Sequence, residues 1–502
     1  MLESTVKQLA GADRESKLDA YMMLVRALKA SNNLPDRIAL QDQMGLFMQF
    51  IQRDVTTKNV TGTIDSSLAN HALTLLVTFL YYPAIASTLS YDFGVFIIDY
   101  CIRCFEDNSI PKDVIRHSMQ VVASQDFSPK VMTADRIGRL VAALHKLEEH
   151  MKGKSIIMSR IIIYRRLVKQ SKVHMASHTD WLLDLFADML SGMKEIRTAA
   201  VALGFEAIFT IGKEKQLSRR VMEILQLTVD DIKYIEYYVQ KLLTMAGNKQ
   251  ESAVVPQIWS VIILLLRCPV EKWEFFSPWL EIIQKCFNSG DPHTKLEANY
   301  AWNRLVYAFY LNESSFSKTI GTVCQPFLSQ LKRKVSGKFQ EEFRRVVFGS
   351  ICNLYYYAFK PNSTSAQVDH YWVACVRPIM QKLTTTESET KQNEKSTFSP
   401  SDNLVQATII LTGLFDSSTP RVWKEDRIAE NPLVKPDELP AVDPKWIRKN
   451  ADKVFAVVDP IISKSFLDMA SLGSPTHKLW HTLISTVAAA ASKEVKAMVR
   501  WA

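Results

Sequence analysis

One local pattern of polar and apolar residues recurs along the chain. A polar turn is followed by an aliphatic residue, then by small residues at helical spacing, then by large apolar residues. Apolar residues spaced by three and four indicate one buried helical face, and small side chains let a helix pack closely between two neighbours. The pattern therefore predicts the inner helices of stacked pairs. Their first inward aliphatic residues, called anchors below, are Leu68, Val114, Ile196 and Leu296.

The spacing of the anchors predicts a repeat. Successive anchors are separated by 46, 82 and 100 residues, and the last two intervals are each close to two periods of about 40–50 residues. Weaker repeats are therefore expected near Ile156 and Val254, and further helices over 338–359, 401–415 and 476–490. Paired helices with a period of about 40–47 residues are typical of HEAT and armadillo repeats. The predicted fold class is an all-α, HEAT/armadillo-like α-solenoid, and a non-repeating helical domain is the alternative.

Two segments interrupt this ladder of helices. Residues 384–400 have no apolar face and are predicted to form a mobile loop. Residues 416–446 contain several prolines and are predicted to be an irregular connection. We therefore expect a solenoid over 1–415 and continuing helical repeats over 447–502. Because the last predicted helix runs to the end of the sequence, we expect the chain to be a fragment of a longer protein.

Composition supports a helical protein. Glycine and proline together make up 35 of 502 residues, about 7% against a usual share of roughly 12%, and glycine supplies the tight turns of strand-rich and nucleotide-binding folds. The seven cysteines are odd in number and dispersed, which indicates free thiols in a reducing compartment. Residues 66–91 carry no formal charge, but polar residues interrupt them. We predict a buried helix ending before Pro83 there, and no transmembrane segment.

Two short motifs resemble metal sites, and each fails on its spacing or context. His145 and His150 are five residues apart, whereas a zinc-binding helix needs histidines four apart on one face. Cys101 and Cys104 have no second pair at zinc spacing and lie in an apolar helical stretch. We predict no catalytic residue, no metal and no cofactor, and hence no enzyme. A hydrolase whose site is assembled from distant residues is the weakest alternative.

The net charge of +9 is concentrated in two stretches that lack acidic residues. Residues 150–179 carry a net +7 and residues 314–340 a net +5, so the rest of the chain sums to −3. A weaker basic patch lies over 213–220. The candidate DNA-binding residues are Lys152, Lys154, Arg160, Arg165, Arg166, Lys169, Lys172, Lys213, Lys215, Arg219, Arg220, Lys332, Arg333, Lys334 and Lys338.

The placement of these cations predicts a binding face. On a helix through 160–173, Arg165, Lys169 and Lys172 fall within an arc of about 60°, and apolar residues occupy the other side. Such a face suits binding to a nucleic-acid backbone through counterion release, without reading of bases. The alternatives are a solvated basic helix and, for the function, a protein–protein scaffold or import-type adaptor that binds a peptide or protein in its groove. Lys332-Arg333-Lys334 also fits a nuclear-import patch.

Six stretches carry a resemblance to a known family through their order and spacing. They are Asp19-Ala-Tyr-Met-Met-Leu, Ala72-Leu73 through Leu80-Tyr81-Tyr82-Pro83 to Ser90, Val114 through Gln125-Asp-Phe127, Asp180-Trp181 through Ile196-Arg197 to Gly204, Pro256-Gln-Ile-Trp259 and Ala298-Asn-Tyr-Ala-Trp302. With these stretches the chain resembles the N-terminal helical-repeat (HEAT-type) domain of the Rap-interacting factor (Rif) proteins, which regulate telomeres and replication timing. The resemblance covers residues 17–310.

The resemblance implies a hook-shaped or curved solenoid that binds DNA, double-stranded or at junctions, by backbone contacts. It implies a nuclear protein of chromosomes and telomeres that acts in telomere length regulation, DNA-end protection and repair, replication timing and the cell cycle. Telomeric and chromatin proteins are the implied partners, and a homodimer is considered as well. Longer family members recruit protein phosphatase one through short docking motifs. The string of this type here, Arg345 to Phe348, lies in a predicted helix, so we assign phosphatase binding to regions outside this chain.

Overall fold

The computed structural model describes residues 2–30, 37–333, 337–385 and 400–501. The contacts within it divide the chain into two compact units, Met1–Ile224 and Leu225–Ala502, and each is described by itself. Almost all of the regular structure is helical, as the sequence predicts. Most of the predicted loop over 384–400 lies outside the described residues.

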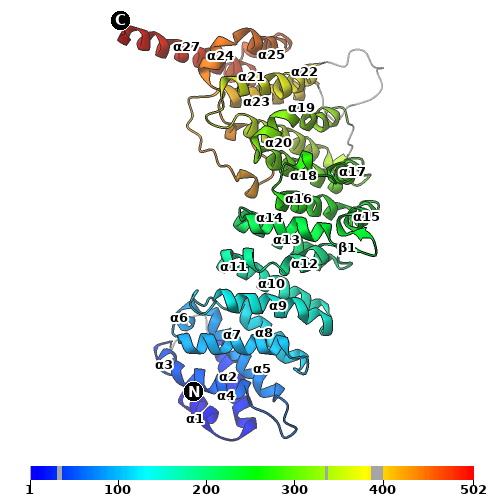
Figure 1. The fold of residues 1–502 in the computed structure, drawn as a ribbon. Coiled ribbons are helices and arrows are strands. Elements are labelled where there is room, and N and C mark those ends of the chain that lie inside the picture. Colours follow the sequence, from blue (N-terminus) through cyan, green and yellow to red (C-terminus); the bar gives the residue numbers. More distant parts are fainter. Residues whose placement is uncertain (1, 31–36, 334–336, 386–399, 502) are drawn as a thin grey trace. The chain divides into compact units, whose positions relative to one another are not determined.

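The first unit consists of helices stacked in two rows (Figure 1). One row contains α2, α5, α8, α10 and α13, each packed on the next, and α4, α7, α9 and α12 form the second row. The helices are α1 (Leu2–Ala10), α2 (Arg14–Ala30), α3 (Arg37–Asp42), α4 (Met44–Val55), α5 (Ser66–Tyr81), α6 (Pro83–Ala86), α7 (Tyr91–Glu106), α8 (Lys112–Ser124), α9 (Ala134–His150), α10 (Lys154–Gln170), α11 (Lys172–Ser177), α12 (Trp181–Met189), α13 (Lys194–Ile211) and α14 (Lys215–Gln226), which reaches the boundary between the units.

The second unit has a two-row arrangement of its own. Helices α16, α18 and α20 form one row, and α15 and α17 begin the other. The helices are α15 (Tyr234–Ala246), α16 (Val255–Leu266), α17 (Phe276–Phe287), α18 (Pro292–Tyr310), α19 (Glu313–Gln330), α20 (Gln340–Ala358), α21 (Ser365–Tyr371), α22 (Arg377–Thr384), α23 (Pro400–Phe415), α24 (Pro444–Lys449), α25 (Ala451–Lys464), α26 (Phe466–Met469) and α27 (Pro475–Trp501). Strands β1 (Thr228–Val229) and β2 (Ile232–Lys233) form one small antiparallel hairpin.

The anchors begin the inner row where the sequence places them. Leu68, Val114, Ile196 and Leu296 are buried near the first turns of α5, α8, α13 and α18. Capping residues fix some of these starts: the Asp65 carboxylate accepts a hydrogen bond from the Leu68 N–H at 3.2 Å, which satisfies a donor left free at a helix start. The weaker repeats that were expected near 156 and 254 are present as α10 and α16.

Contacts between neighbouring repeats confirm the period. Residues that meet across successive helices are separated by 41 positions at Lys154–Glu195 and at Arg165–Glu206. The separation is 44 at Ser260–Arg304. These values agree with the 40–47-residue repeat that the anchors predict, and they favour the solenoid over a non-repeating helical domain.

The predicted buried helix of the uncharged segment is also confirmed. Helix α5 ends at Tyr81, and Pro83 occupies the first position of α6. This is a favoured position for proline, because it has no N–H to donate. In the part of the chain that the structure describes, no helix combines the length and apolar character needed to span a membrane.

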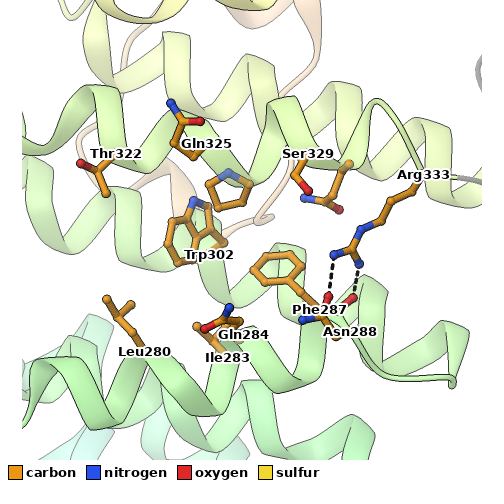
Figure 2. Close-up of a pocket in the computed structure, with 12 residues that line it drawn as sticks. Leu280, Ile283, Gln284, Phe287, Asn288, Trp302, Thr322, Gln325, Ser329 and Arg333 are labelled. Atoms are coloured by element: carbon orange, nitrogen blue, oxygen red, sulfur yellow. Dashed lines mark hydrogen bonds between the residues drawn. The ribbon is translucent and has the colours of Figure 1, made fainter.

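Side chains leave a pocket among α17, α18 and α19 in the second unit (Figure 2). At one end of the pocket Arg333 follows α19 and reaches the carboxyl end of α17. Its Nη1 donates to the Phe287 carbonyl and its Nη2 donates to Asn288 Oδ1 at 2.7 Å. A cation is favourable there, because the last carbonyls of a helix carry partial negative charge.

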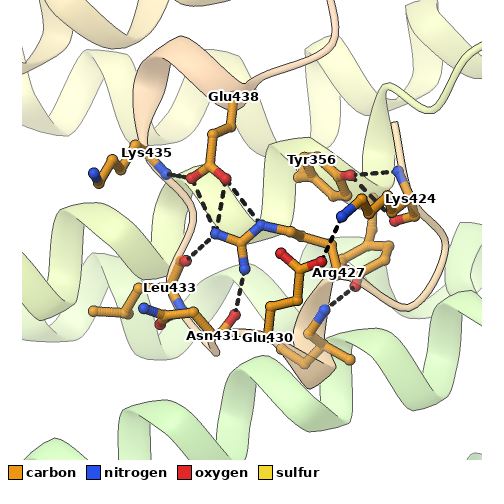
Figure 3. A network of polar contacts seen from close by, with 10 residues as sticks. Tyr356, Lys424, Arg427, Glu430, Asn431, Leu433, Lys435 and Glu438 are labelled. Carbon is orange, nitrogen blue, oxygen red and sulfur yellow. Dashed lines mark hydrogen bonds and ion pairs between the residues drawn. The ribbon is translucent and has the colours of Figure 1, made fainter. Parts of the chain in front are cut away.

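The predicted irregular connection packs against α18 and α20. Between α23 and α24 it contains only the short 3₁₀ helices η5 (Arg427–Ala429) and η6 (Pro436–Glu438). Within the connection Arg427 Nε donates to Glu438 Oε1 at 2.9 Å, and the Lys424 N–H donates to the Tyr356 hydroxyl of α20 at 2.8 Å (Figure 3). Asn303 of α18 donates to the Pro432 carbonyl at 2.8 Å. These contacts hold a segment without regular secondary structure firmly on two helices.

Candidate nucleic-acid interface

Helix α10 positions most of the first basic stretch. Its apolar side chains, among them Ile163, Tyr164, Leu167 and Val168, are buried against neighbouring helices, as the sequence predicts. The helix has 17 residues and is therefore about 25 Å long at 1.5 Å per residue. The basic residues at its two ends consequently form two separate groups.

The larger group lies at the carboxyl end of α10 and continues onto α11 and α14, which follow on the same edge of the first unit (Figure 1). Ser177 at the end of α11 donates a hydrogen bond to Gln216 of α14 at 3.2 Å, which joins these two helices. We call this group the α10–α14 patch. It comprises Arg165, Lys169, Lys172, Lys213, Lys215, Arg219 and Arg220.

Glu206 of α13 is the principal counter-charge of the patch. Its carboxylate accepts a hydrogen bond from Arg165 Nε at 2.8 Å and pairs with Lys169 as well. Burial of the Glu206 carboxyl opposes ionisation, but the hydrogen bonds from Lys169 and Arg165 outweigh it and lower its pKa below the ordinary value. One ionised carboxylate thus faces two cations. The Lys169 and Arg165 side chains are still 60% and 43% exposed.

Two other residues of the patch, Lys172 and Arg220, do not pair with Glu206 and differ in whether they have a carboxylate partner. Lys172 is exposed, and no carboxylate lies within 4 Å of it in the described ranges. Arg220 pairs with Glu223 one turn further along α14, with its Nη1 at 3.1 Å from the carboxylate. Arg166, adjacent to the patch in sequence, points toward the turn after α8, where its Nε donates to the Gln125 carbonyl at 2.8 Å.

The smaller group lies at the amino end of α10. Lys152 and Lys154 are exposed, and Lys154 pairs with Glu195 at 2.7 Å. The structure adds Lys112 and Arg116 of α8, which sequence reasoning missed. Lys112 Nζ donates to the Lys152 carbonyl at 3.2 Å, and Arg116 Nη2 donates to Ser155 Oγ at 3.1 Å. Lys112 and Arg116 precede these partners by 40 and 39 residues, which is about one repeat. The repeat period therefore places them beside the amino end of α10, and this could have been predicted from the sequence.

Arg160 is a correction to the predicted set. Its side chain is only 2% exposed and lies among three carboxylates, at 2.6 Å from Glu148, 3.3 Å from Asp184 and 3.0 Å from Asp188. Burial raises the pKa of Asp188 to about 6, even though Arg160 acts against the rise. The carboxylates come from α9 and α12, which flank α10 in space. Arg160 therefore stabilises the interior and is not placed to meet a phosphate.

The second basic stretch, in the other unit, is divided among several roles. Lys332 and Lys338 are exposed, and Lys338 Nζ lies 5.5 Å from the centre of the Phe339 ring. Arg333 uses both terminal nitrogens on the end of α17, and burial lowers its pKa. Arg333 is thus a helix-capping residue, which corrects its assignment to a phosphate-binding face. Lys334 lies outside the described residues.

The cysteine pair and the histidine that were considered as metal-site motifs in the sequence have contacts within the protein. Cys101 and Cys104 are buried, and burial raises the pKa of both thiols, which is the environment of inert structural cysteines. His145 Nδ1 lies 2.8 Å from Asp184. Within the described ranges no three His, Cys, Asp or Glu side chains gather as a metal site would require.

Comparison with known proteins gives the family. A family model described as the N-terminal region of Rap1-interacting factor 1 matches residues 9–376. The chain belongs to this family. The match confirms the resemblance found in the sequence and extends it beyond residue 310.

Relatives of this Rap1-interacting-factor domain agree in fold along nearly its whole length. The telomere length regulator protein rif1 of Schizosaccharomyces pombe is 22% identical over 515 residues, which cover 99% of this chain and 35% of that protein. The chain thus spans about a third of the relative's length. The crystal structure of the Rif1 N-terminal domain from Saccharomyces cerevisiae in complex with DNA matches with a TM-score of 0.74 and 12% identity. A second crystal structure of the Rif1 N-terminal domain from Saccharomyces cerevisiae matches with a TM-score of 0.70 and 13% identity. Both matches cover 97% of this chain and 49% of the other chain.

The docking-type string can now be placed within this family domain. Arg345 to Phe348 lies inside α20, and Val346, Val347 and Phe348 are buried. The predicted helix is confirmed. A docking motif that binds as an added strand needs an extended, accessible backbone, and this string offers neither.

Proposed function

We propose that this domain binds DNA through its sugar-phosphate backbone and has no enzymatic activity. The observation that carries the proposal is the α10–α14 patch, in which cations from α10, α11 and α14 lie on one edge of the first unit. DNA, double-stranded or at a junction, is the proposed ligand. The Saccharomyces cerevisiae domain of the same fold was crystallised with DNA, which supports this choice of ligand.

The ion pairs of the patch are suited to exchange with phosphates. Ion pairs whose cation is solvent-exposed, such as Arg165–Glu206 with Arg165 43% exposed, contribute on the order of 1 kcal/mol each, so little is lost when a phosphate oxygen takes over one of the hydrogen bonds of the cation. Each phosphate that is neutralised releases condensed counterions, and this release drives binding without regard to sequence. Lys152 and Lys154, with Lys112 and Arg116, offer a second contact in the same unit. Lys332 and Lys338 offer a weaker one in the other unit.

We further propose a nuclear role at chromosomes and telomeres. The Schizosaccharomyces pombe relative is named as a telomere length regulator, and telomere length regulation is therefore the first role to test. DNA-end protection and replication timing are proposed with it, together with telomeric and chromatin proteins as partners. Because the string over Arg345–Phe348 is helical and largely buried, we assign recruitment of protein phosphatase one to regions outside this chain.

Charge reversal within the patch tests the proposal. Replacement of Arg165, Lys169 and Lys172 by Glu should weaken binding to labelled duplexes of different sequence by on the order of 100-fold, about equally for each sequence. Fluorescence anisotropy near 100 mM salt measures the affinity. The matched control reverses Lys7, Lys29 and Lys58, exposed lysines of the same unit outside the patch, and should change affinity by less than about threefold. Equal affinity of the wild type and the patch variant, with both folded, would refute the proposed face.

A further inference from the structure

The pocket among α17, α18 and α19 has an apolar floor and a polar rim (Figure 2). Ile283, Phe287 and Trp302 are buried residues that line it, and exposed Gln284 and Gln325 stand at its edge. Its volume is about 490 Å³, within the range of sites that hold small ligands or one or two side chains. Such a cavity is large enough to receive one bulky apolar side chain and part of its backbone.

The arrangement of the helices explains the opening. Helix α17 packs on α15 and α18, whereas α19 packs on α18 and on α21 and α22. Pro326 inside α19 has no N–H, so the carbonyl of Thr322, four residues earlier, loses its usual helical donor. Both residues line the pocket. The wall of the pocket thus includes a helix segment whose hydrogen bonding is incomplete.

A buried amide gives the pocket a specific polar requirement. Gln330 borders the pocket and is 2% exposed, and neither its Nε2 nor its Oε1 has a hydrogen-bond partner among the described residues. A buried polar group without a partner is unfavourable. A rotation of the Gln330 side chain toward the pocket would pair its donor and acceptor with the complementary groups of a peptide amide.

A second pocket extends the first across α19. Its volume is about 450 Å³, and it shares Gln325 and Ser329 with the first pocket. Lys332 and Lys382 line it, and Arg333 lines the first pocket. No acidic residue lines either pocket in the described part of the chain. Together the two pockets form a groove with an apolar end and a basic end, which we call the α19 groove.

We propose that the α19 groove binds an acidic peptide segment of a partner protein, anchored by one large apolar side chain. The apolar side chain occupies the first pocket, its backbone amide pairs with Gln330, and the acidic residues lie beside Lys332 and Lys382. An extended segment is recognised in this way by side-chain pockets together with main-chain hydrogen bonds. A peptide fits better than a nucleic acid, because the buried apolar floor suits a single hydrocarbon side chain and both terminal nitrogens of Arg333 are already used within the protein.

This site shares no residue with the α10–α14 patch, and Lys332 is its one residue that also belongs to the weaker DNA contact proposed for the second unit. The groove lies in the second unit, and the α10–α14 patch lies in the first. The patch variant with Arg165, Lys169 and Lys172 reversed should therefore bind peptide as the wild type does. Either activity can fail without the other, and separate measurements distinguish the two failures.

The experiment measures anisotropy of short fluorescein-labelled peptides with the whole chain. Each peptide carries a run of glutamates beside a single leucine, phenylalanine or tryptophan, and the reference peptide has glycine at that position. We expect saturable binding of at least one apolar peptide, about tenfold tighter than the glycine peptide. Ser329→Trp, which fills the groove from an exposed position, and the pair Lys332→Glu with Lys382→Glu should each weaken binding about tenfold. The matched control Lys318→Glu, on the same helix but outside both pockets, should stay within about twofold of the wild type.

Gln330→Met separates binding from folding. The variant removes an unpaired buried amide and should raise the melting temperature, yet it should weaken peptide binding because the amide pairing is lost. Absence of saturable binding to every peptide would overturn the proposal. Binding that Ser329→Trp and the lysine pair leave unchanged would do so as well. Tighter binding of labelled oligothymidylate that Ser329→Trp abolishes would reassign the groove to nucleic acid.

Discussion

The two acid-free stretches look alike in sequence and differ in the structure. In the first unit, cations of the 150–179 stretch join those of α14 at one edge, with Glu206 as their main counter-charge. In the second unit, Arg333 caps α17, while Lys332 lines the α19 groove. The difference shows that the role of a basic residue depends on the helices one repeat before and after it. Their side chains and helix ends decide whether the cation stays available at the surface or is used in a contact within the protein.

Arg160 and Arg165, one and a half turns apart on α10, give the sharpest contrast and the largest expected effect. Arg160→Ala should destabilise the protein by about 3–5 kcal/mol, because it leaves buried carboxylates without their cation. Arg165→Ala should cost roughly 1 kcal/mol or less, because the Arg165 side chain is 43% exposed and Lys169 still pairs with Glu206. Urea unfolding measures both. Similar values for the two variants would remove the distinction between an interior and a surface arginine.

Reversal of the second basic stretch should affect DNA less than reversal of the patch. The double variant Lys332→Glu and Lys338→Glu should weaken duplex binding by about threefold to tenfold. The variant with Arg165, Lys169 and Lys172 replaced by Glu should weaken it by on the order of 100-fold. The same anisotropy titration measures both at one salt concentration. A larger loss from the Lys332 and Lys338 pair would move the main interface into the second unit.

Stability should depend on pH through Asp188 in the interior. Because its folded pKa is raised to about 6, the folded protein binds this proton more tightly than the unfolded chain does. Its contribution is complete below the unfolded value near 4 and is lost as the pH rises through about 6, with a loss on the order of 3 kcal/mol. Thermal unfolding between pH 4 and 7 measures the trend. Asp188→Asn should flatten it, and an unchanged trend in that variant would exclude Asp188 as its source.

The smallest effect is expected at Arg333. Arg333→Gln removes the cation at the end of α17 and should lower stability by about 1 kcal/mol. Duplex affinity should change by less than about twofold, since its terminal nitrogens are occupied within the protein. A strong loss of DNA affinity in a folded Arg333→Gln protein would restore this residue to the phosphate-binding set.

The fold could be predicted largely from the sequence, because its determinants are local. Anchors such as Ile196 repeat with their small neighbours, and proline at 83 marks a helix boundary. The packing of the 416–446 segment was not predictable in the same way. Its prolines indicate irregular backbone, but the hydrogen bond from Asn303 to Pro432 joins residues 129 positions apart, and no local pattern encodes such a contact.

The candidate site was less predictable than the fold. Counting charges along the chain finds Arg165 and Lys169 but gives no sign of Glu206, which lies one repeat later. It also includes Arg160, whose carboxylate partners lie on α9 and α12. A period near 41 residues predicts which charged residues lie beside a basic stretch, because they stand one repeat earlier or later in the sequence. Applied to the 150–179 stretch, this rule predicts that Lys112 and Arg116 lie next to it.

The salt dependence of DNA binding tests the central claim most directly. The observed binding constant on a duplex should fall linearly with salt on logarithmic axes, with a slope of about −0.9 for each phosphate contacted. Neutral replacement of Arg165, Lys169 and Lys172 by Gln should make that slope shallower by about 2.7 if each residue meets one phosphate. An unchanged slope in the folded variant would contradict the account, because the patch would then take no part in backbone binding.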